Sequence, residues 1–307
     1  MADSIGWRIW LGDMPLGAVH LLACDPPLVA VWGSPREAYF FGAYDADYLG
    51  KLTVPAPPAD APHTANWRDF LDGLRAPDGT WLPVVKAGAW QIHTSYDGRF
   101  RVLHTDRDLL VEIDGDITPL ERESDEPLAA VALDRELGTV AALDGHSRLQ
   151  FFQQALAMGT YTLDGADAAS GCLLTLPDAP DAALVVAGVQ ALLIDTAGQI
   201  RQQTRARSPL TAVDIAPDAS LVATAESASL RILDGRLVPL WQAAVPDLLD
   251  ALDPLDDDTA AISTNPAVPV RSVAILAEGT IGFVAGGMLG ITIADAFEPL
   301  PQPRPLL

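Results

Sequence analysis

The chain of 307 residues contains 41 acidic and 19 basic side chains, which give it a formal net charge of −22 at pH 7. A surface of this charge repels nucleic acid and anionic lipid, so we expect neither as a partner and expect instead a protein with a basic surface. Apolar runs are far shorter than the roughly 18–20 residues of a membrane helix, and residues 1–15 lack the pattern of a secretory signal.

The remaining composition predicts a cytoplasmic bacterial protein. Cys24 and Cys172 lie far apart in apolar runs, which favours two buried small side chains in a reducing compartment over a disulfide or a metal-binding pair. Asn occurs only at Asn66 and Asn265, whereas Ala, Leu, Asp, Pro and Arg are frequent. This usage is typical of a GC-rich bacterial coding bias and carries no information about function.

The first elements of the chain are short β-strands. Residues 5–12 (IGWRIWLG) form a strand-like run ahead of any complete repeat. We expect this strand to pair with the last repeat and so to close a ring, because an unpaired sheet edge invites aggregation. Residues 18–54 follow with four apolar runs separated by turns, and they form the first complete unit of four strands.

An insertion with a helix is predicted at residues 57–88. The Pro- and Ala-rich connector 55–62 (PAPPADAP) leads into it. The segment 66–75 then places apolar residues at the i, i+3, i+4, i+7 spacing of an amphipathic helix. The apolar positions of this helix are Trp67, Phe70, Leu71 and Leu74. Residues 81–86 have the composition of a further strand, which we assign to the insertion.

The segment 208–244 shows the repeat most clearly. It contains the runs LTAVDI, LVATA, LRIL and LVPLW, separated by turn residues that include Asp234–Gly235, a strong hairpin signal. Pro239 cannot donate to a β-ladder, so the last strand is expected at a sheet edge. Four antiparallel strands in about 40 residues, with the last at an edge, describe one blade of a β-propeller.

The same unit recurs along the chain, and we predict an all-β, six-bladed propeller in a single domain. The predicted blades are 18–54, 90–120, 128–163, 172–207, 208–244 and 271–300. Second strands aligned at positions 100, 139, 183 and 221 are 39, 44 and 38 residues apart by subtraction, as four-stranded blades require. The two longer intervals coincide with the insertions at 57–88 and 245–269. A degenerate seventh blade within 57–88 remains an alternative.

The second insertion contains a short acidic helix at residues 247–252, whose apolar positions are Leu248, Leu249 and Leu252. Two interpretations of both helices stay open. Each apolar face either packs on its own propeller or is presented to a partner as an exposed anchor of a binding surface. Under the second interpretation, the partner-binding residues are Trp67, Phe70, Leu71, Leu74, Leu248, Leu249 and Leu252.

The chain resembles the WD40/YVTN-like β-propeller superfamily over nearly its whole length. The segments that carry the resemblance are 94–115 (TSYDGRFRVLHTDRDLLVEIDG), 132–152 (ALDRELGTVAALDGHSRLQFF) and 215–235 (IAPDASLVATAESASLRILDG). The repeat is degenerate, because no Trp-Asp pair ends a third strand and no Gly-His pair opens a blade. The resemblance implies a disc with a central channel that serves as a rigid platform for partners.

The sequence offers few residues for catalysis, and we predict no catalytic, cofactor-binding or metal-binding residues. His93 and His104 lie in successive strands and are candidate neighbours, so a metal site with Asp106 is conceivable, although half-buried strand histidines explain them as well. Asp45 and Asp47 do not continue into an EF-hand loop. The glycine-rich run 282–290 lacks the spacing of a nucleotide-binding loop.

The function predicted from these observations is a non-catalytic scaffold subunit for protein–protein interaction in a bacterial multi-protein system. The first alternative is a metal-assisted hydrolase of the lactonase type, which would need Glu, Asn and Asp ligands at the propeller axis. The second alternative is a binder of small ligands or glycans that uses an aromatic loop.

Overall fold

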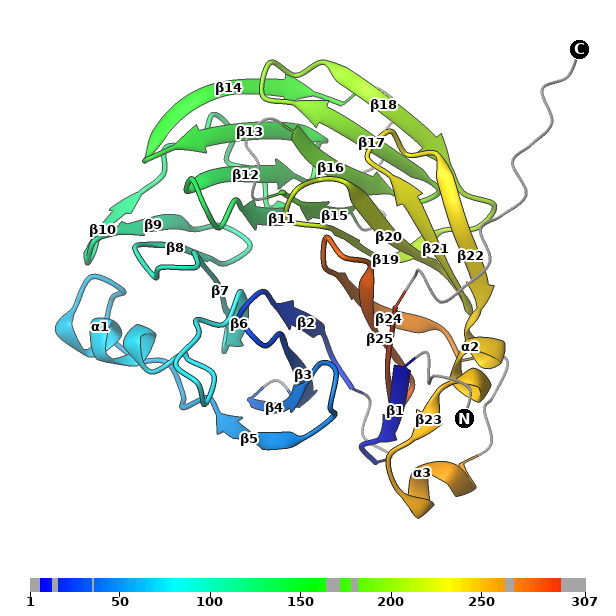
Figure 1. Ribbon diagram of the computed structural model, residues 1–307. Helices are drawn as coiled ribbons and strands as arrows, with labels where there is room; N and C mark the ends of the chain where they lie inside the picture. The colour runs from blue at the N-terminus through cyan, green and yellow to red at the C-terminus, as the bar shows by residue number, and fades with distance from the viewer. Residues whose placement is uncertain are drawn as a thin grey trace, which may run out of the picture.

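The computed structural model describes residues 6–12, 16–34, 36–163, 172–177, 182–262 and 268–293. Six mainly antiparallel sheets are arranged in a ring around a central axis (Figure 1). This arrangement confirms the predicted six-bladed, all-β propeller. Residues 57–88 contain no separate sheet, so the alternative of a seventh blade in this segment is wrong.

Four of the sheets have four strands, numbered here from the inner to the outer edge of each blade. Blade 1 consists of β2 (Val19–Leu22), β3 (Leu28–Ser34), β4 (Glu37–Gly42) and β5 (Tyr48–Thr53). Blade 3 consists of β11 (Leu128–Leu133), β12 (Thr139–Asp144), β13 (Arg148–Gln153) and β14 (Leu156–Thr162). Blade 4 consists of β15 (Cys172–Thr175), β16 (Ala182–Ala187), β17 (Gln190–Asp195) and β18 (Ile200–Arg205). Blade 5 consists of β19 (Leu210–Ile215), β20 (Leu221–Glu226), β21 (Ser229–Asp234) and β22 (Pro239–Ala244).

The other two sheets have five strands. Blade 2 consists of β6 (Val84–Ala87), β7 (Trp90–Thr94), β8 (Phe100–His104), β9 (Leu109–Ile113) and β10 (Asp116–Pro119). Blade 6 consists of β24 (Val270–Ile275), β25 (Thr280–Ala285), β26 (Met288–Ile293), β1 (Gly6–Trp10) and the two-residue β23 (Asp253–Pro254).

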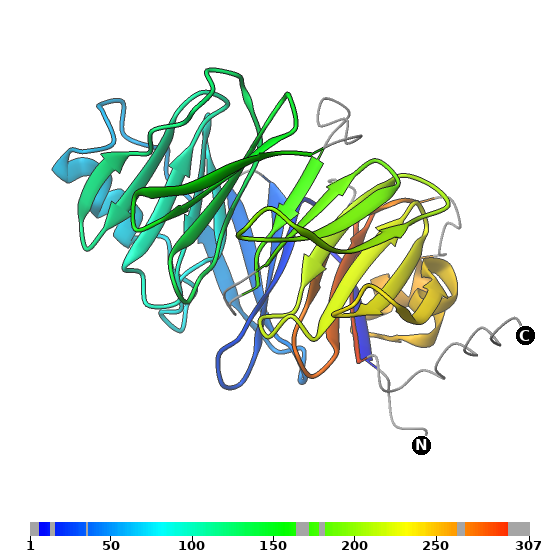
Figure 2. The same ribbon diagram turned by 90° about the horizontal axis from the view of Figure 1, so that it is seen from above.

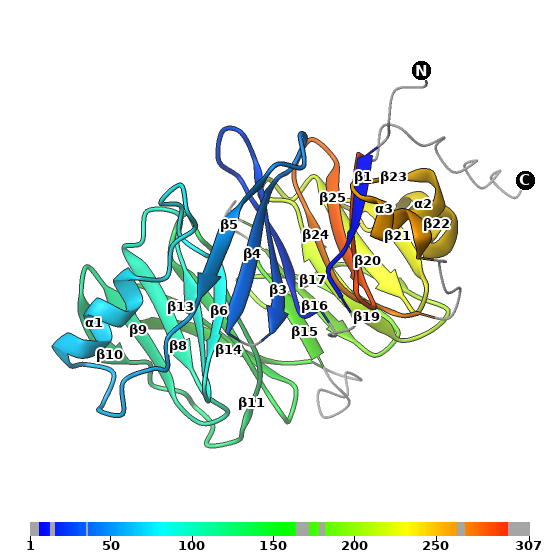
Figure 3. The ribbon, with the colours of Figure 1, turned by 90° about the horizontal axis from the view of Figure 1, so that it is seen from below.

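Residues from the two ends of the chain share blade 6. β1 pairs antiparallel with β26, with Trp7 opposite Ile291, and β23 pairs parallel with β1 (Figure 3). The backbone N–H of Trp10 also donates to Oγ1 of Thr259 at 2.8 Å. The pairing covers the outer edge of β26, so both hydrogen-bonding edges of this long apolar strand are occupied.

Burial explains why the second strand of each blade is so apolar. In β12, β16 and β25 every residue is buried, because neighbouring blades cover both faces of the strand. The outermost β18 is almost fully exposed and carries Arg201 and Arg205. Six apolar clusters hold the described part of the propeller together, each at a contact between adjacent blades.

Aspartates stabilise many of the hairpin turns. In eight turns of the described residues, Oδ1 of an Asp accepts the backbone N–H of the residue two positions later at 2.8–3.2 Å. This is the local bond for which Asp is favoured in turns. The eight residues are Asp45, Asp78, Asp97, Asp134, Asp144, Asp195, Asp218 and Asp234. Part of the acidic excess of the sequence therefore has a structural cause.

Three helices occur in the described residues, all within the two insertions. They are α1 (Ala65–Asp72), α2 (Val245–Ala251) and α3 (Asp257–Ala261). α3 was not predicted, because its five residues are too few to show an apolar helical pattern. Asp256 caps this helix, since its Oδ1 accepts the N–H of Thr259 at 2.6 Å.

The insertion at 57–88 is shorter than predicted, because residues 84–87 form β6 and pair with β7 in the sheet of blade 2. β6 lies on the inner side of that sheet. Val85 and Ala87 are buried there with side chains of blade 1. The sequence pattern indicated a strand here, but it did not show which sheet the strand would join.

Candidate functional site

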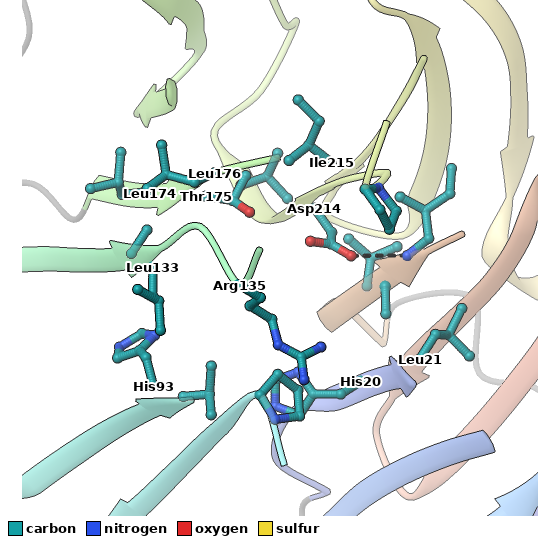
Figure 4. Close-up of a pocket in the computed structure, with 18 of the residues that line it drawn as sticks. His20, Leu21, His93, Leu133, Arg135, Leu174, Thr175, Leu176, Asp214 and Ile215 are labelled. Atoms are coloured by element: carbon teal, nitrogen blue, oxygen red, sulfur yellow. Dashed lines mark hydrogen bonds between the residues drawn. The ribbon is translucent and has the colours of Figure 1, made fainter. Parts of the chain in front are cut away.

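A cavity of about 250 Å³ lies on the propeller axis (Figure 4). We call it the axial cavity. Its walls are mostly apolar residues of the inner strands, and several blades add a polar side chain. These polar side chains are His20 from β2, His93 from β7, Arg135 from the turn after β11, Thr175 from β15, Asp214 from β19 and Ser272 from β24.

The guanidinium of Arg135 points into this cavity beside His20 (Figure 4). Its Nε donates to the carbonyl oxygen of Thr94 at 3.0 Å, its Nη2 donates to that of Trp81 at 3.2 Å, and it stacks over the ring of Tyr96 at 4.0 Å. Burial, assisted by the positive charge of Arg135, lowers the pKa of His20 to about 4. His20 is therefore neutral at pH 7.

Two polar side chains of the axial cavity join neighbouring blades. Oδ2 of Asp214 accepts the backbone N–H of Ile275 at 2.9 Å, and Oγ of Ser272 accepts that of Val19 at 3.0 Å. The innermost strands have no further strand to pair with, so side chains satisfy part of their free edge. These residues hold blades 5, 6 and 1 together, which is a structural role.

A second and wider hollow, of about 740 Å³, opens next to the axial cavity and shares Tyr96 and Pro217 with it. We call it the axial mouth. Its other lining residues are Ala23, Cys24, Gly79, Thr80, Trp81, Asp97, Glu136 and Asp218. They come from blade 1, the first insertion and the turns that follow β7, β11 and β19.

Three exposed carboxylates, those of Asp97, Glu136 and Asp218, line the axial mouth. Oδ1 of Asp97 accepts the N–H of Arg99 at 3.0 Å, and Oδ1 of Asp218 accepts the N–H of Ser220 at 3.0 Å. The turns thus fix both carboxyl groups before any ligand binds. The three residues occupy corresponding turns of their blades, and this was the one signal in the sequence that could have revealed the mouth.

The aromatic wall of the mouth is formed by Tyr96 and the buried Trp81. The Trp81 ring contacts the guanidinium groups of Arg75 and Arg101, whose central carbons lie 3.5 and 4.5 Å from its centroid. Gly98 lies against the same ring with φ of +73°, and a side chain at this position would collide with the indole. These contacts hold Trp81 of the first insertion rigidly against blade 2.

Of the two cysteines, Cys24 is half-buried at the axial mouth and carries a free thiol. Burial raises the pKa of this thiol, and the nearby carboxylate of Asp78 raises it further. A raised pKa makes the thiol a poor nucleophile at neutral pH. The side chain of Cys172 lies outside the described residues.

The seven proposed partner-binding residues are all buried, and they belong to two separate clusters. Trp67, Phe70, Leu71 and Leu74 pack between blades 1 and 2, whereas Leu248, Leu249 and Leu252 pack between blades 5 and 6. Figure 2 shows α1 and α2 at opposite sides of the ring. The structure therefore supports the other interpretation, in which each helix packs on its own propeller.

Charged contacts fix α1 to blade 2. The buried Arg101 donates from Nη1 to both carboxylate oxygens of Glu112, at 2.9 and 3.0 Å, and from Nη2 to Asp72 at 2.8 Å. Nε1 of Trp67 donates to the carbonyl oxygen of Asp60 at 2.8 Å. The helix is thus a built-in part of the domain.

The other candidates have structural partners. His93 and His104 are neighbours, with their Nε2 atoms 3.3 Å apart, while Asp106 is exposed in the turn beyond them. In the turn between β9 and β10, Asp114 pairs with Arg99, and the hydrogen bond from that side chain lowers the pKa of Asp114. The glycine-rich run 282–290 forms the tightly packed hairpin of β25 and β26.

Within the described ranges, no group of three or more His, Cys, Asp or Glu residues is placed to hold a metal ion. The described helices are also too short or too polar to cross a membrane.

Comparisons with known proteins show the fold alone. No family model and no curated protein matches the chain. Among solved structures, the chain is similar to Raptor of Chaetomium thermophilum, with a TM-score of 0.67 and 13% sequence identity. The match covers 98% of this chain and 30% of the Raptor chain, so this chain spans less than a third of that protein's length. The similarity shows a shared propeller architecture.

Proposed function

We propose that this chain is a non-catalytic scaffold for protein–protein interaction that binds a basic partner at the axial mouth. The observation that carries the proposal is the mouth itself, a hollow of about 740 Å³ at the centre of a rigid ring, with three exposed carboxylates from three blades. A cationic segment gains attraction from all three carboxylates, and the excess negative charge of the chain raises its rate of encounter.

The surroundings of the mouth also favour such a ligand. A Lys or Arg side chain that enters the hollow can contact the ring of Tyr96 with its aliphatic stem while its charge meets the carboxylates. Because turn bonds hold Asp97 and Asp218, these two side chains lose little conformational freedom when a ligand binds. Anionic lipid and nucleic acid are negatively charged, so the carboxylates of the mouth repel them.

We extend the proposal to a cytoplasmic subunit of a bacterial multi-protein system with a degenerate WD40-like repeat. Composition and repeat pattern support this part of the proposal. Propellers of this kind commonly present one face to a partner while the ring itself remains unchanged.

Two charge variants test the proposal. The mouth variant combines Asp97→Asn, Glu136→Gln and Asp218→Asn. The remote variant makes the same change in net charge on exposed residues of blade 2 and the segment that follows, with Asp116→Asn, Glu121→Gln and Glu123→Gln. Asn and Gln retain the oxygen that accepts the turn hydrogen bonds, so both variants should fold.

The measurement is a quantitative pull-down from cells of the source organism, with the captured proteins identified by mass spectrometry. We expect a specific protein to be captured by the wild-type and remote variants and lost from the mouth variant. Equal capture by all three proteins would exclude the mouth as the binding surface. Capture of no specific protein by the wild-type chain would contradict the scaffold function itself.

A further inference from the structure

The imidazoles of His93 on β7 and His104 on β8 form a pair at the wall of the axial cavity. The two Nε2 atoms are 3.3 Å apart, whereas the ring centroids are 5.4 Å apart and the ring planes differ by 26°. Since the nitrogens are much closer than the centroids, each ring directs its Nε2 at the other. A single proton can occupy the space between the two nitrogens.

The opposite side of the His104 ring determines which nitrogen carries its proton. Nδ1 of His104 lies 3.3 Å from the carbonyl oxygen of Thr105, which can only accept a hydrogen bond. The proton of His104 therefore lies on Nδ1, and its Nε2 has a free electron pair. An Nδ1–H group bonded to a backbone carbonyl also orients imidazoles that bind metals through Nε2.

Burial disfavours the charged form of both rings. Burial lowers the pKa of His93 well below its ordinary value of 6.5, with further contributions from His104 and His20, and burial also lowers the pKa of His104. Neutral imidazole is the form that coordinates a metal, so a metal ion need not displace a proton from a cationic ring.

We propose that His93 and His104 together bind one borderline divalent transition-metal ion, of the class of Zn²⁺ or Cu²⁺. Two nitrogens bound to tetrahedral Zn²⁺ at about 2.0–2.1 Å from the metal are about 3.3–3.4 Å apart. The two Nε2 atoms already have this separation. The ion lies beside the line that joins the two nitrogens, and the shared proton moves from Nε2 to Nδ1 of His93, so the binding step adds no charge to either ring.

The rest of the coordination shell comes from water. His93 lines the axial cavity, whose volume of about 250 Å³ accommodates several water molecules. Since no third ligand of the usual types joins the pair in the described residues, we expect weaker binding than at structural zinc sites with four protein ligands. Imidazole nitrogen selects borderline transition metals over Mg²⁺ and Ca²⁺, which prefer oxygen ligands.

The first test uses the unmodified chain. Protein labelled with ¹⁵N is titrated with ZnCl₂ in buffer that contains excess Mg²⁺ to occupy the surface carboxylates, and the imidazole nitrogens are followed by long-range ¹H–¹⁵N NMR. We expect the Nε2 signals of His93 and His104 to shift together and to saturate at one equivalent, while those of His63 and His146 stay in place. Unchanged His93 and His104 signals would overturn the proposal.

The second test uses variants and calorimetric titration with ZnCl₂. His93→Gln and His104→Gln should each lower the affinity for Zn²⁺ at least tenfold. The control is His146→Gln, which removes an exposed imidazole 3.4 Å from Glu126 and should leave the affinity unchanged. Affinity that stays at the wild-type value in both pair variants would also overturn the proposal. If a variant does not fold, the NMR titration decides, and neither test depends on the scaffold function.

Discussion

The two helical insertions and the axial mouth differ in which of their side chains remain available to a partner. The helices carry apolar residues that would make strong anchors if they were exposed, but Trp67 and Leu71 are 1% and 0% exposed. The mouth is built from ordinary turn residues, and its carboxylates face solvent. An amphipathic pattern therefore indicates burial on the nearest apolar surface before it indicates a partner.

The comparison also shows how a propeller builds a site. A helix beside the ring buries its apolar face against the two blades that flank it, so this face is not available to a partner. Corresponding turns of different blades are far apart in sequence, yet they meet around the axis because every blade points the same turn toward the centre of one face. Acidic residues recur in these turns for local structural reasons. Because the turns meet around the axis, their negative charges are concentrated at the mouth.

The largest effect is expected for Trp67→Ala, which removes a buried ring that contacts Trp90 and Phe70, with centroids 5.7 and 5.4 Å away. We expect a loss of about 3–5 kcal/mol in the free energy of unfolding, measured by urea denaturation. Leu156→Ala is the control, because this side chain is 71% exposed and should change stability by less than about 0.5 kcal/mol. If the Trp67→Ala protein kept its stability but no longer bound its partner, the result would support the interpretation of α1 as a docking surface.

A second prediction compares two ion pairs of blade 2. Glu112→Gln leaves the buried Arg101 with the carboxylate of Asp72 alone, and we expect it to cost about 3 kcal/mol. Asp114→Asn breaks the pair between Asp114 and Arg99, which solvent screens, so it should change stability far less than Glu112→Gln. Equal costs for the two variants, measured by urea denaturation, would contradict the role assigned to the buried network.

The third prediction concerns pH. The pKa of His20 is about 4 in the folded protein and about 6.5 in the unfolded chain, so between these values only the unfolded chain binds the proton. The free energy of unfolding therefore falls as the pH decreases from about 6.5 to 4. The shift of the His20 pKa sets an upper limit of about 3 kcal/mol for this fall, and water in the cavity makes the actual fall smaller. His20→Gln should reduce the slope of stability against pH in chelator-treated buffer, and an unchanged slope would refute this assignment.

The smallest effect in energy is expected at the mouth. A ten-residue oligolysine peptide should bind the mouth variant about tenfold more weakly than the wild-type chain, and added salt should weaken wild-type binding. The remote variant has the same net charge and should change the affinity less than twofold. Equal loss in both variants, measured by fluorescence anisotropy, would show that only total charge matters. Neither variant should unfold more readily than the wild-type chain.

Several features of the protein could be predicted from sequence because their causes are local. The interval of about 40 residues, the turn at Asp234–Gly235 and short continuous apolar runs such as 140–143 determine blades of four strands. The spacing of Trp67, Phe70 and Leu71 determines a helix with one apolar face. The contact between His93 and His104 follows from their places in two successive strands.

Only the tertiary structure decided where these elements are placed. Ring closure placed β6 inside blade 2, buried the apolar faces of α1 and α2 between blades, and brought His20 next to Arg135. The mouth likewise depends on closure, since its carboxylates belong to turns of three different blades. Periodicity and turn chemistry act over a few residues, whereas these contacts join residues that are neighbours only after the ring has formed.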